Sequence, residues 1–190
     1  MNKVKFGLKN VYISLITETV TSGEISYTYG TPQHLPGAVN LSLDVDGSTN
    51  PFYADNVVYY QTVANNGYSG TLEIAMITDW FRTNVLQEQA MQNGIIAEYS
   101  DKYPKAFAMA FQIDGDETNT LYWYYNCTAT RPSVNGATVE ENIEPQTDTL
   151  DIAMRARATD ALVRIKSSES TPTATINAWF DAVIEPQATT

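Results

Sequence analysis

The 190-residue sequence has one cysteine, one histidine and no long apolar run. The lone Cys127 excludes an internal disulfide framework, and a reducing folding environment is its simplest explanation. No apolar segment approaches the roughly 18 residues that a membrane-spanning helix requires, so membrane insertion is not expected. The N-terminus is basic, but it lacks the apolar core and the small-residue cleavage site of a signal peptide.

Basic residues are also scarce, with 11 Lys and Arg against 22 Asp and Glu and a formal charge of −11 at pH 7. No basic residue occurs between Lys9 and Arg82, whereas seven acidic residues fall in that stretch. An acidic surface repels phosphate groups, so tight or sequence-specific nucleic-acid binding is not expected. Solubility alone is an equally good explanation for the charge.

Groups that could perform catalysis are few. A Cys127–His34 pair is formally available, but Cys127 lies in an apolar strand pattern, where a buried and inert thiol is expected. The sequence has no zinc-binding spacing and no glycine-rich phosphate loop, and its Asp44–Asn50 segment matches a calcium loop only weakly. No pair of carboxylates is singled out. We therefore expect a non-enzymatic protein with no catalytic residue, no metal site and no cofactor.

The dominant positive pattern is alternation of apolar and polar residues, which predicts strands with one buried face. It is clearest over 39–46, 70–77, 107–113 and 147–154, and weaker over 6–25 and 176–184. Residues 121–131 are aromatic on both faces at first, which is typical of a central strand. These patterns predict one mainly β domain over residues 1–190.

One helix is predicted, over residues 78–92. Thr78 suits the N-cap, Asp79 suits the positive end of the helix dipole, and Asn93-Gly94 forms a C-terminal stop signal. The helix would place one apolar stripe across a sheet, composed of Ile77, Phe81, Val85, Leu86 and Ala90.

The segment 47–70 is unusually long and aromatic for a loop. Loops longer than about 12–15 residues without their own structure are uncommon in compact domains and are usually functional. Its aromatic residues are Phe52, Tyr53, Tyr59, Tyr60 and Tyr68. The segment either folds back on its own domain or contacts a partner, and we favour a partner.

The strands over 39–46, 70–77 and 147–154 share a second property, a polar and partly acidic face. If they pair, one face would carry Asp44, Asp46, Thr71, Glu73, Thr149 and Asp151. Such a face could simply contact bulk water. Alternatively, several copies could close into a ring whose lumen these side chains line, and an acidic lumen would let DNA pass without adhering.

Several segments also carry a family resemblance: GTPQHLPGAVNLSLDVDG (30–47), NPFYADNVVYYQTVANNGYSGTLEIA (50–75), YNCTATRPS (125–133) and IEPQTDTL (143–150). They resemble the major tail proteins of long-tailed phages of Gram-positive bacteria. The opening KVKFGLKNVYISLI is similar to that family as well. The resemblance extends over nearly the whole chain, and it is strongest over PFYADN (51–56) and YNCTATRP (125–132).

The resemblance implies a tail-tube fold: two packed antiparallel sheets, sandwich-like or barrel-like, with a flanking helix and a long inter-ring loop. It implies a structural virion protein of a siphophage that polymerises as stacked hexameric rings into the tail tube and conducts DNA during ejection. The six polar residues named above would face the lumen. The inter-ring loop candidates are Pro51, Phe52, Tyr53, Asp55, Tyr59, Tyr60 and Tyr68, joined by an N-terminal arm (1–10) with Lys3, Lys5 and Lys9.

The same resemblance implies partners and a location. Further copies of the chain, the tape measure, the tail terminator and the distal tail protein would be partners, and DNA would pass transiently and non-specifically. Assembly would occur in the cytoplasm of the host bacterium and end in the virion tail. A flexible tail (185–190) and no C-terminal immunoglobulin-like domain are expected.

Two alternatives stay open. One is a tail-completion or baseplate component with the same fold. The other, from a different class, is a β-sandwich glycan-binding module with Trp123, Tyr124 and Tyr125, or the tyrosines of the 47–70 segment, as stacking platforms.

Overall fold

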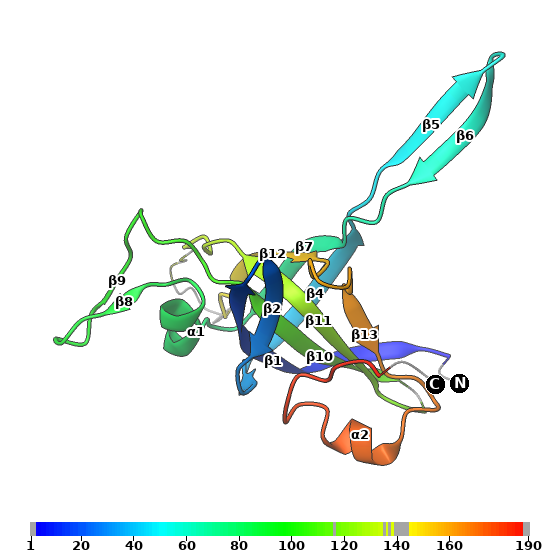
Figure 1. Ribbon diagram of the computed structural model, residues 1–190. Helices are drawn as coiled ribbons and strands as arrows, with labels where there is room; N and C mark the ends of the chain where they lie inside the picture. The colour runs from blue at the N-terminus through cyan, green and yellow to red at the C-terminus, as the bar shows by residue number, and fades with distance from the viewer. Residues whose placement is uncertain (1–2, 116, 135, 137, 139–144, 188–190) are drawn as a thin grey trace.

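The computed structural model describes residues 3–115, 117–134, 136, 138 and 145–187, and strands dominate it (Figure 1). The strands are β1 (Lys5–Thr21), β2 (Glu24–Tyr29), β3 (Gln33–His34), β4 (Ala38–Val45), β5 (Thr49–Ala54), β6 (Val57–Val63), β7 (Tyr68–Ile74), β8 (Gln89–Ala90), β9 (Ile96–Ala97), β10 (Phe107–Gly115), β11 (Thr120–Ala129), β12 (Asp148–Arg155) and β13 (Arg164–Lys166). The helices are α1 (Asp79–Asn84) and α2 (Thr173–Asn177). The prediction of a mainly β chain is confirmed.

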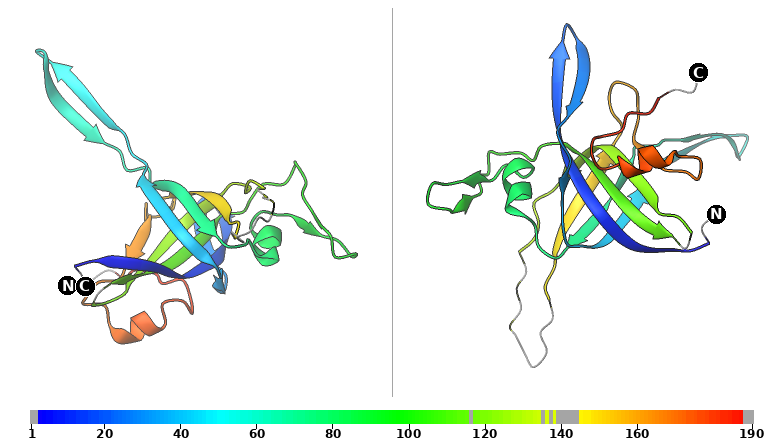
Figure 2. Two further views of the ribbon diagram at one scale, coloured as in Figure 1. Left: turned by 180° about the vertical axis from the view of Figure 1, so that it is seen from behind. Right: turned by 90° about the horizontal axis from the view of Figure 1, so that it is seen from below.

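One large antiparallel sheet forms the body, in the order β2-β1-β10-β11-β12-β7-β4. Two short strands join it at the side, because β13 pairs with β11 and β3 pairs with β1. The sheet is curled, so that β4 at its end lies across the first part of β1 (Figure 2). Among the described residues no helix is both long and apolar enough to cross a membrane.

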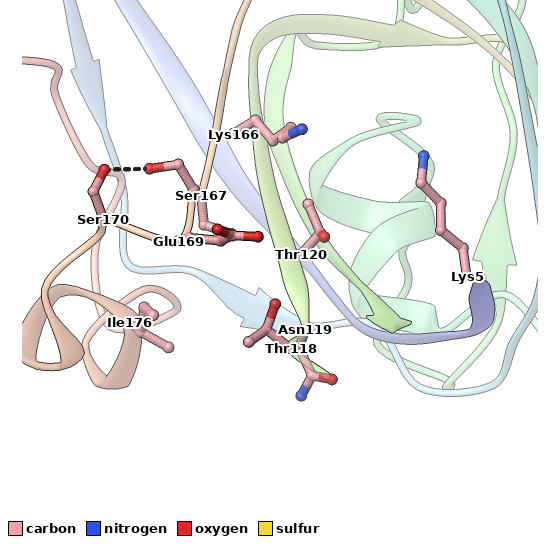
Figure 3. Close-up of a pocket in the computed structure, with 10 residues that line it drawn as sticks. Lys5, Thr118, Asn119, Thr120, Lys166, Ser167, Glu169, Ser170 and Ile176 are labelled. Carbon is pink, nitrogen blue, oxygen red and sulfur yellow. Dashed lines mark hydrogen bonds between the residues drawn. The ribbon is translucent and has the colours of Figure 1, made fainter. Parts of the chain in front are cut away.

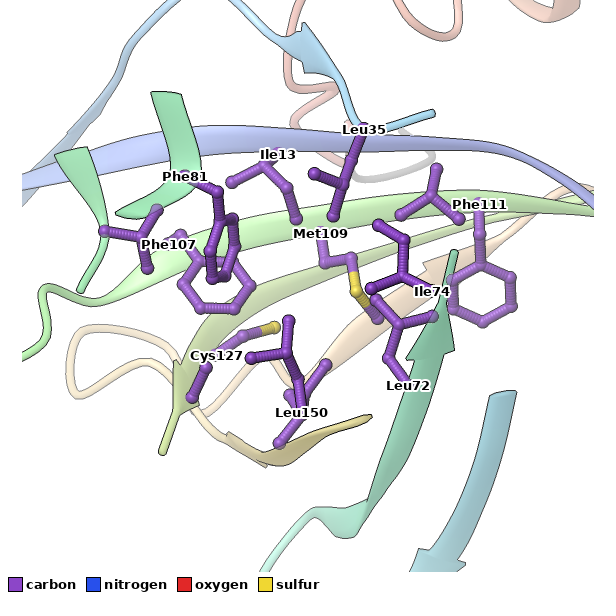
Figure 4. Packing of buried hydrophobic residues seen from close by; sticks show 14 of the residues in the cluster. Ile13, Leu35, Leu72, Ile74, Phe81, Phe107, Met109, Phe111, Cys127 and Leu150 are labelled. Atoms are coloured by element: carbon purple, nitrogen blue, oxygen red, sulfur yellow. The ribbon is translucent and has the colours of Figure 1, made fainter. Parts of the chain in front are cut away.

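The main core lies inside this curl (Figure 4). It is formed by the alternating apolar residues that the sequence pattern indicated, such as Leu72, Ile74 and Leu150. Helix α1 contributes Phe81, whose ring meets that of Phe107 edge-on with centroids 5.8 Å apart. Burial of such side chains contributes about 1.5–3 kcal/mol each, and this core therefore holds the curled shape.

A second apolar cluster lies on the opposite face of β10 and β11. Residues around β13 and in the chain after α2, up to Ile184, cover this face, and Trp123 and Trp179 are both buried there. The Trp123 Nε1–H group donates to the Trp179 carbonyl oxygen at 2.9 Å. Strands β10 and β11 are thus buried on both faces, which confirms the central position predicted for 121–131.

Two predicted elements differ in the structure. Helix α1 begins as expected, with the Thr78 hydroxyl accepting from the Phe81 N–H group, but it ends at Asn84 rather than near residue 92. Gln87 adopts a φ of 63°, which ends the helical path, and the chain then enters β8. The closing strand predicted over 176–184 is absent, because α2 and a turn occupy this region.

Candidate assembly surfaces

The long segment predicted as a loop is a β-hairpin, formed by β5 and β6, that projects away from the body (Figures 1 and 2). Its turn is Asp55-Asn56, with φ values of 52° and 61°. Positive φ at both central residues is what a two-residue type I′ turn requires, and Asp and Asn tolerate it best after glycine. The segment therefore has regular structure of its own, up to the tip.

The hairpin presents its aromatic side chains to solvent. Exposure is 61% for Phe52, 63% for Tyr53 and 74% for Tyr59. The predicted loop residues Pro51, Asp55 and Tyr60 are exposed too. Tyr68 is the exception: it begins β7, is half-buried, and meets the Tyr124 ring edge-on. The prediction that Tyr68 belongs to the projecting segment is wrong.

The base of the hairpin is braced by Arg155 from β12. Its guanidinium forms an ion pair with Asp46 and donates to the Asn66 carbonyl oxygen at 2.9 Å. Backbone hydrogen bonds add to this brace, from Asn66 to Asp46 at 2.7 Å and from Asp46 to Gly67 at 2.9 Å. The hairpin therefore leaves the body in a defined direction.

Strands β4, β7 and β12 pair as expected, and their polar residues lie in rows. Thr71 lies opposite both Ser42 and Asp151, and Glu73 lies opposite both Asn40 and Thr149. Residues directly opposite one another share a face of the sheet. Asp44 lies opposite Ser69, which is on the same face of β7 as Thr71. Five of the six predicted lumen residues are thus brought together on one face: Asp44, Thr71, Glu73, Thr149 and Asp151.

The charges of this polar face differ in their surroundings. Asp44 and Asp151 are exposed, whereas the half-buried Glu73 carboxylate accepts from the Thr147 hydroxyl at 2.7 Å. Asp46 is neutralised by Arg155 at the base of the hairpin. Asp44 and Asp151 are therefore the stronger candidates for a charge that acts on a neighbouring molecule.

The predicted N-terminal arm is largely part of the sheet. Lys5 begins β1 opposite Gly115, and Lys9 pairs with the Asp114 carboxylate at 2.5 Å. Lys3 lies outside the strand and is exposed, and residues 1–2 fall outside the described ones. The predicted arm over residues 1–10 therefore overlaps the sheet from residue 5, because β1 pairs with β10 from Lys5 onward, with register shifts around Gly7 and before Tyr12.

The predicted C-terminal tail is held at its start. Arg157, which is buried, donates to Glu185 at 2.7 Å and to Asp160 at 2.5 Å, and lies over the Tyr125 ring. Residue 185 is thus tethered, and residues 188–190 fall outside the described ones. Sequence reasoning missed Arg157, and no local pattern singled it out, because its partners lie far apart along the chain.

Sequence reasoning also missed the arm formed by β8 and β9, which Figure 1 shows projecting on the side of α1. Arg131 ties the chain just after β9 to the body, by donating to the Tyr99 carbonyl oxygen at 2.7 Å and pairing with Glu98 at 3.0 Å. The arm was missed because its first strand, β8, lies within the range that was predicted as a helix, 78–92. The Gly94 turn signal was present, but it belongs to the tip of the arm and not to a helix end.

A groove of about 640 Å³ lies between the start of β11, the loop after β13 and α2 (Figure 3). Lys5, Lys166 and Glu169 line it, together with several hydroxyl groups. Its buried Ser167 is structural, because the hydroxyl accepts from the Leu121 N–H group at 2.9 Å. The chain's one histidine and one cysteine lie elsewhere, so the groove lacks a nucleophile–base pair that uses either.

The remaining chemical candidates lie apart. Cys127 is fully buried in the main core, where desolvation raises the pKa of its thiol well above the usual value. His34 is exposed and lies against the Tyr12 ring, with centroids 5.0 Å apart. In the described part of the chain, no group of three or more His, Cys, Asp or Glu side chains is placed to hold a metal ion.

Trp123, Tyr124 and Tyr125 do not form an exposed platform. All three are buried, and burial raises the pKa of the Tyr124 hydroxyl to about 12. The proposal of a glycan-stacking surface on these residues is therefore wrong. The exposed aromatic residues of this protein lie mainly on the β5–β6 hairpin.

The described residues define a mainly β protein with a projecting hairpin that is rich in exposed apolar side chains, and with a polar sheet face that they leave uncovered. Comparison of the sequence with models of known protein families and with curated proteins gives no match.

Proposed function

We propose that this chain is the structural subunit of a phage tail tube, in which hexameric rings stack and the β5–β6 hairpin contacts the next ring. The exposed apolar surface of the hairpin carries the proposal. A two-stranded hairpin is marginally stable alone in water, and contiguous exposed apolar surface marks interaction sites. A partner that covers the hairpin would therefore stabilise it.

The polar face of β4, β7 and β12 supports the same proposal. It consists mainly of hydroxyl, amide and carboxylate groups, while the opposite face of these strands packs into the main core. A channel for DNA needs a wall that does not bind phosphate, and the exposed carboxylates of Asp44 and Asp151 repel it. We assign this face to the lumen.

In this proposal the protein acts without catalysis or a cofactor. Its partners are further copies of itself and, at the ends of the tube, the tape measure, terminator and distal tail proteins. It assembles in the cytoplasm of the host bacterium and functions in the virion tail, where DNA passes along the lumen during ejection.

Electron microscopy and sedimentation of the purified protein test the proposal. Hollow tubes built of stacked rings are the expected result. Single rings that do not stack would indicate the tail-completion or baseplate alternative. A monomer under every condition tested, with affinity for a glycan through the exposed Tyr59 and Tyr60, would overturn the proposal and favour the glycan-binding module.

A further inference from the structure

The curled sheet leaves a seam between β1 and β4. Strand β4 ends the sheet order, and the first part of β1 pairs only with β10 among the described residues. Both strands are irregular where they face each other. A register shift between Ala38 and Asn40 leaves Val39 outside the pairing, and another surrounds Gly7, which has a φ of 74°. Bulges disrupt the local ladder and bend the strand, so neither strand presents a regular edge at the seam.

A groove of about 360 Å³ lies along this seam. Its floor is formed by Leu8, Leu41 and Ile113, which pack against the main core. Its rim carries Phe6 and Val39, both more than half exposed. The positively charged Lys5 also lines it.

The β5–β6 hairpin has complementary properties. Its exposed side chains are mainly apolar or aromatic, and Asp55, at its turn, is the only charged residue between positions 47 and 70. A groove with apolar side chains on its floor and rim and a lysine beside them matches a mainly apolar hairpin with a carboxylate at its tip.

The two surfaces also lie at opposite ends of one strand. The groove involves the start of β4 at Val39, and the hairpin follows the end of β4 at Val45. A contact between different surfaces of identical copies is heterologous, and it propagates unless rotation closes it. Donor and acceptor at opposite ends of β4 therefore suit a subunit that stacks.

We propose that the β5–β6 hairpin of a second copy of this chain docks in the β1–β4 groove, with its apolar side chains over Phe6 and Val39 and the Asp55 carboxylate beside Lys5. This inference rests on the proposed function and specifies the acceptor of the hairpin. A single copy leaves both its hairpin and its β1–β4 groove exposed. Each docking contact would bury the hairpin of one copy and the groove of the next.

A charge exchange tests the contact between Asp55 and Lys5. Asp55→Lys and Lys5→Glu should each lower the polymer fraction in sedimentation several-fold, and the double variant should recover it. The matched control is Asp55→Lys with Lys166→Glu. It carries the same turn substitution and the same net charge, but Lys166 lies outside the seam groove, so no recovery is expected. Equal recovery in both double variants, or in neither, would overturn the assignment.

Disulfide trapping locates the contact independently. A Val57→Cys chain and a Val39→Cys chain of different mass are mixed under assembly conditions with an oxidant, and Cys127 stays buried in both. The crosslinked heterodimer should form several-fold more than with Val20→Cys, because Val20 is at least as exposed as Val39 but lies on the β1–β2 hairpin. Predominant Val57→Cys self-crosslinks would show hairpin-to-hairpin contact instead. Normal wild-type tubes without the predicted crosslink refute this inference alone, whereas a wild type that never polymerises refutes the tube as well.

Discussion

At the residue scale, two glycines at the base of the hairpin have no room for a side chain. A Cβ atom on Gly47 would lie 2.4 Å from the Ala64 carbonyl oxygen, and one on Gly67 would lie 1.9 Å from the Met154 carbonyl oxygen. Gly67 also has a φ of 100°. The close approach of the two chains at the base, and so the direction of the hairpin, depends on these positions.

Gly67→Ala is therefore expected to destabilise the subunit strongly. The positive φ alone costs about 1–3 kcal/mol, and the contact with Met154 adds to that cost. Gly23→Ala is the matched control, because Gly23 has a φ of 87° with nothing within 4 Å of the added Cβ. Urea unfolding at pH 7 should show a clearly larger loss for Gly67→Ala. Equal losses in the free energy of unfolding would show that the clash at the base is relieved cheaply.

A second prediction concerns acid. Hydrogen bonds from Lys9 and Gln112 lower the pKa of Asp114 below its usual range. A lowered pKa in the folded state stabilises the fold above the unfolded pKa of about 3.9, and this stabilisation is lost as the pH falls through the folded value. Asp114→Asn should therefore be less stable than wild type at pH 7, and the difference should shrink below about pH 4. A difference in urea unfolding that is unchanged at pH 3 would contradict this.

At the element scale, the strands were predictable and the connections were less so. Alternation placed β4, β7 and β12 correctly, because one buried face imposes a period of two on each strand. Asp55-Asn56 is the turn of the hairpin within 47–70, but no apolar face alternates there, since the side chains of the hairpin stay exposed among the described residues of the subunit. Alternation of apolar and polar residues reflects burial within the subunit. An element whose side chains are buried only by a partner therefore shows little alternation.

The predictions of a helix over 78–92 and of a strand over 176–184 were wrong for a related reason. The apolar spacing of Phe81, Val85 and Leu86 is correct for burial, but a short helix followed by a turn buries these residues as well as a long helix would. Trp179 was assigned to a strand, although it reaches the second cluster from the turn after α2. The choice between helix, turn and strand in these regions depends on packing partners far along the chain. A local sequence pattern carries no information about those partners.

The hairpin supplies the element-scale prediction. The double variant Phe52→Ala/Tyr53→Ala should fold with nearly the wild-type free energy of unfolding, because exposed side chains contribute little to the subunit. It should assemble poorly, with a several-fold lower polymer fraction in sedimentation. Val134→Ala, which removes another exposed apolar side chain, serves as the control. Normal tubes from the double variant would refute the assembly role of the hairpin.

At the scale of the whole molecule, the distribution of charge supports a channel more than a binding site. The acidic side chains of the polar face cover strands whose other face is core, so the sheet separates an apolar interior from a surface suited to repel DNA. The sequence indicated this face, but not that Asp46 would be neutralised by Arg155 from a strand more than 100 residues away.

Reversal of the exposed charges tests the channel. Asp44→Lys/Asp151→Lys should still permit tubes, but the tubes should retain DNA at low salt, because lysines in the lumen bind phosphate. The control variant Asp44→Asn/Asp151→Asn removes the repulsion of DNA by the carboxylates without adding a positive charge. Its tubes should retain far less DNA than those of the lysine variant. Retention of labelled DNA fragments by sedimented tubes gives the readout. Equal retention by wild type and the lysine variant would place these carboxylates outside the lumen.

A cryo-electron microscopy reconstruction of tubes grown from the wild-type chain tests the central claim most directly. The account predicts stacked rings with the β5–β6 hairpin of each subunit buried against the next ring and the polar face of β4, β7 and β12 lining the channel. A tube whose hairpins extend into solvent, or whose polar face lies on the outer wall, would contradict it.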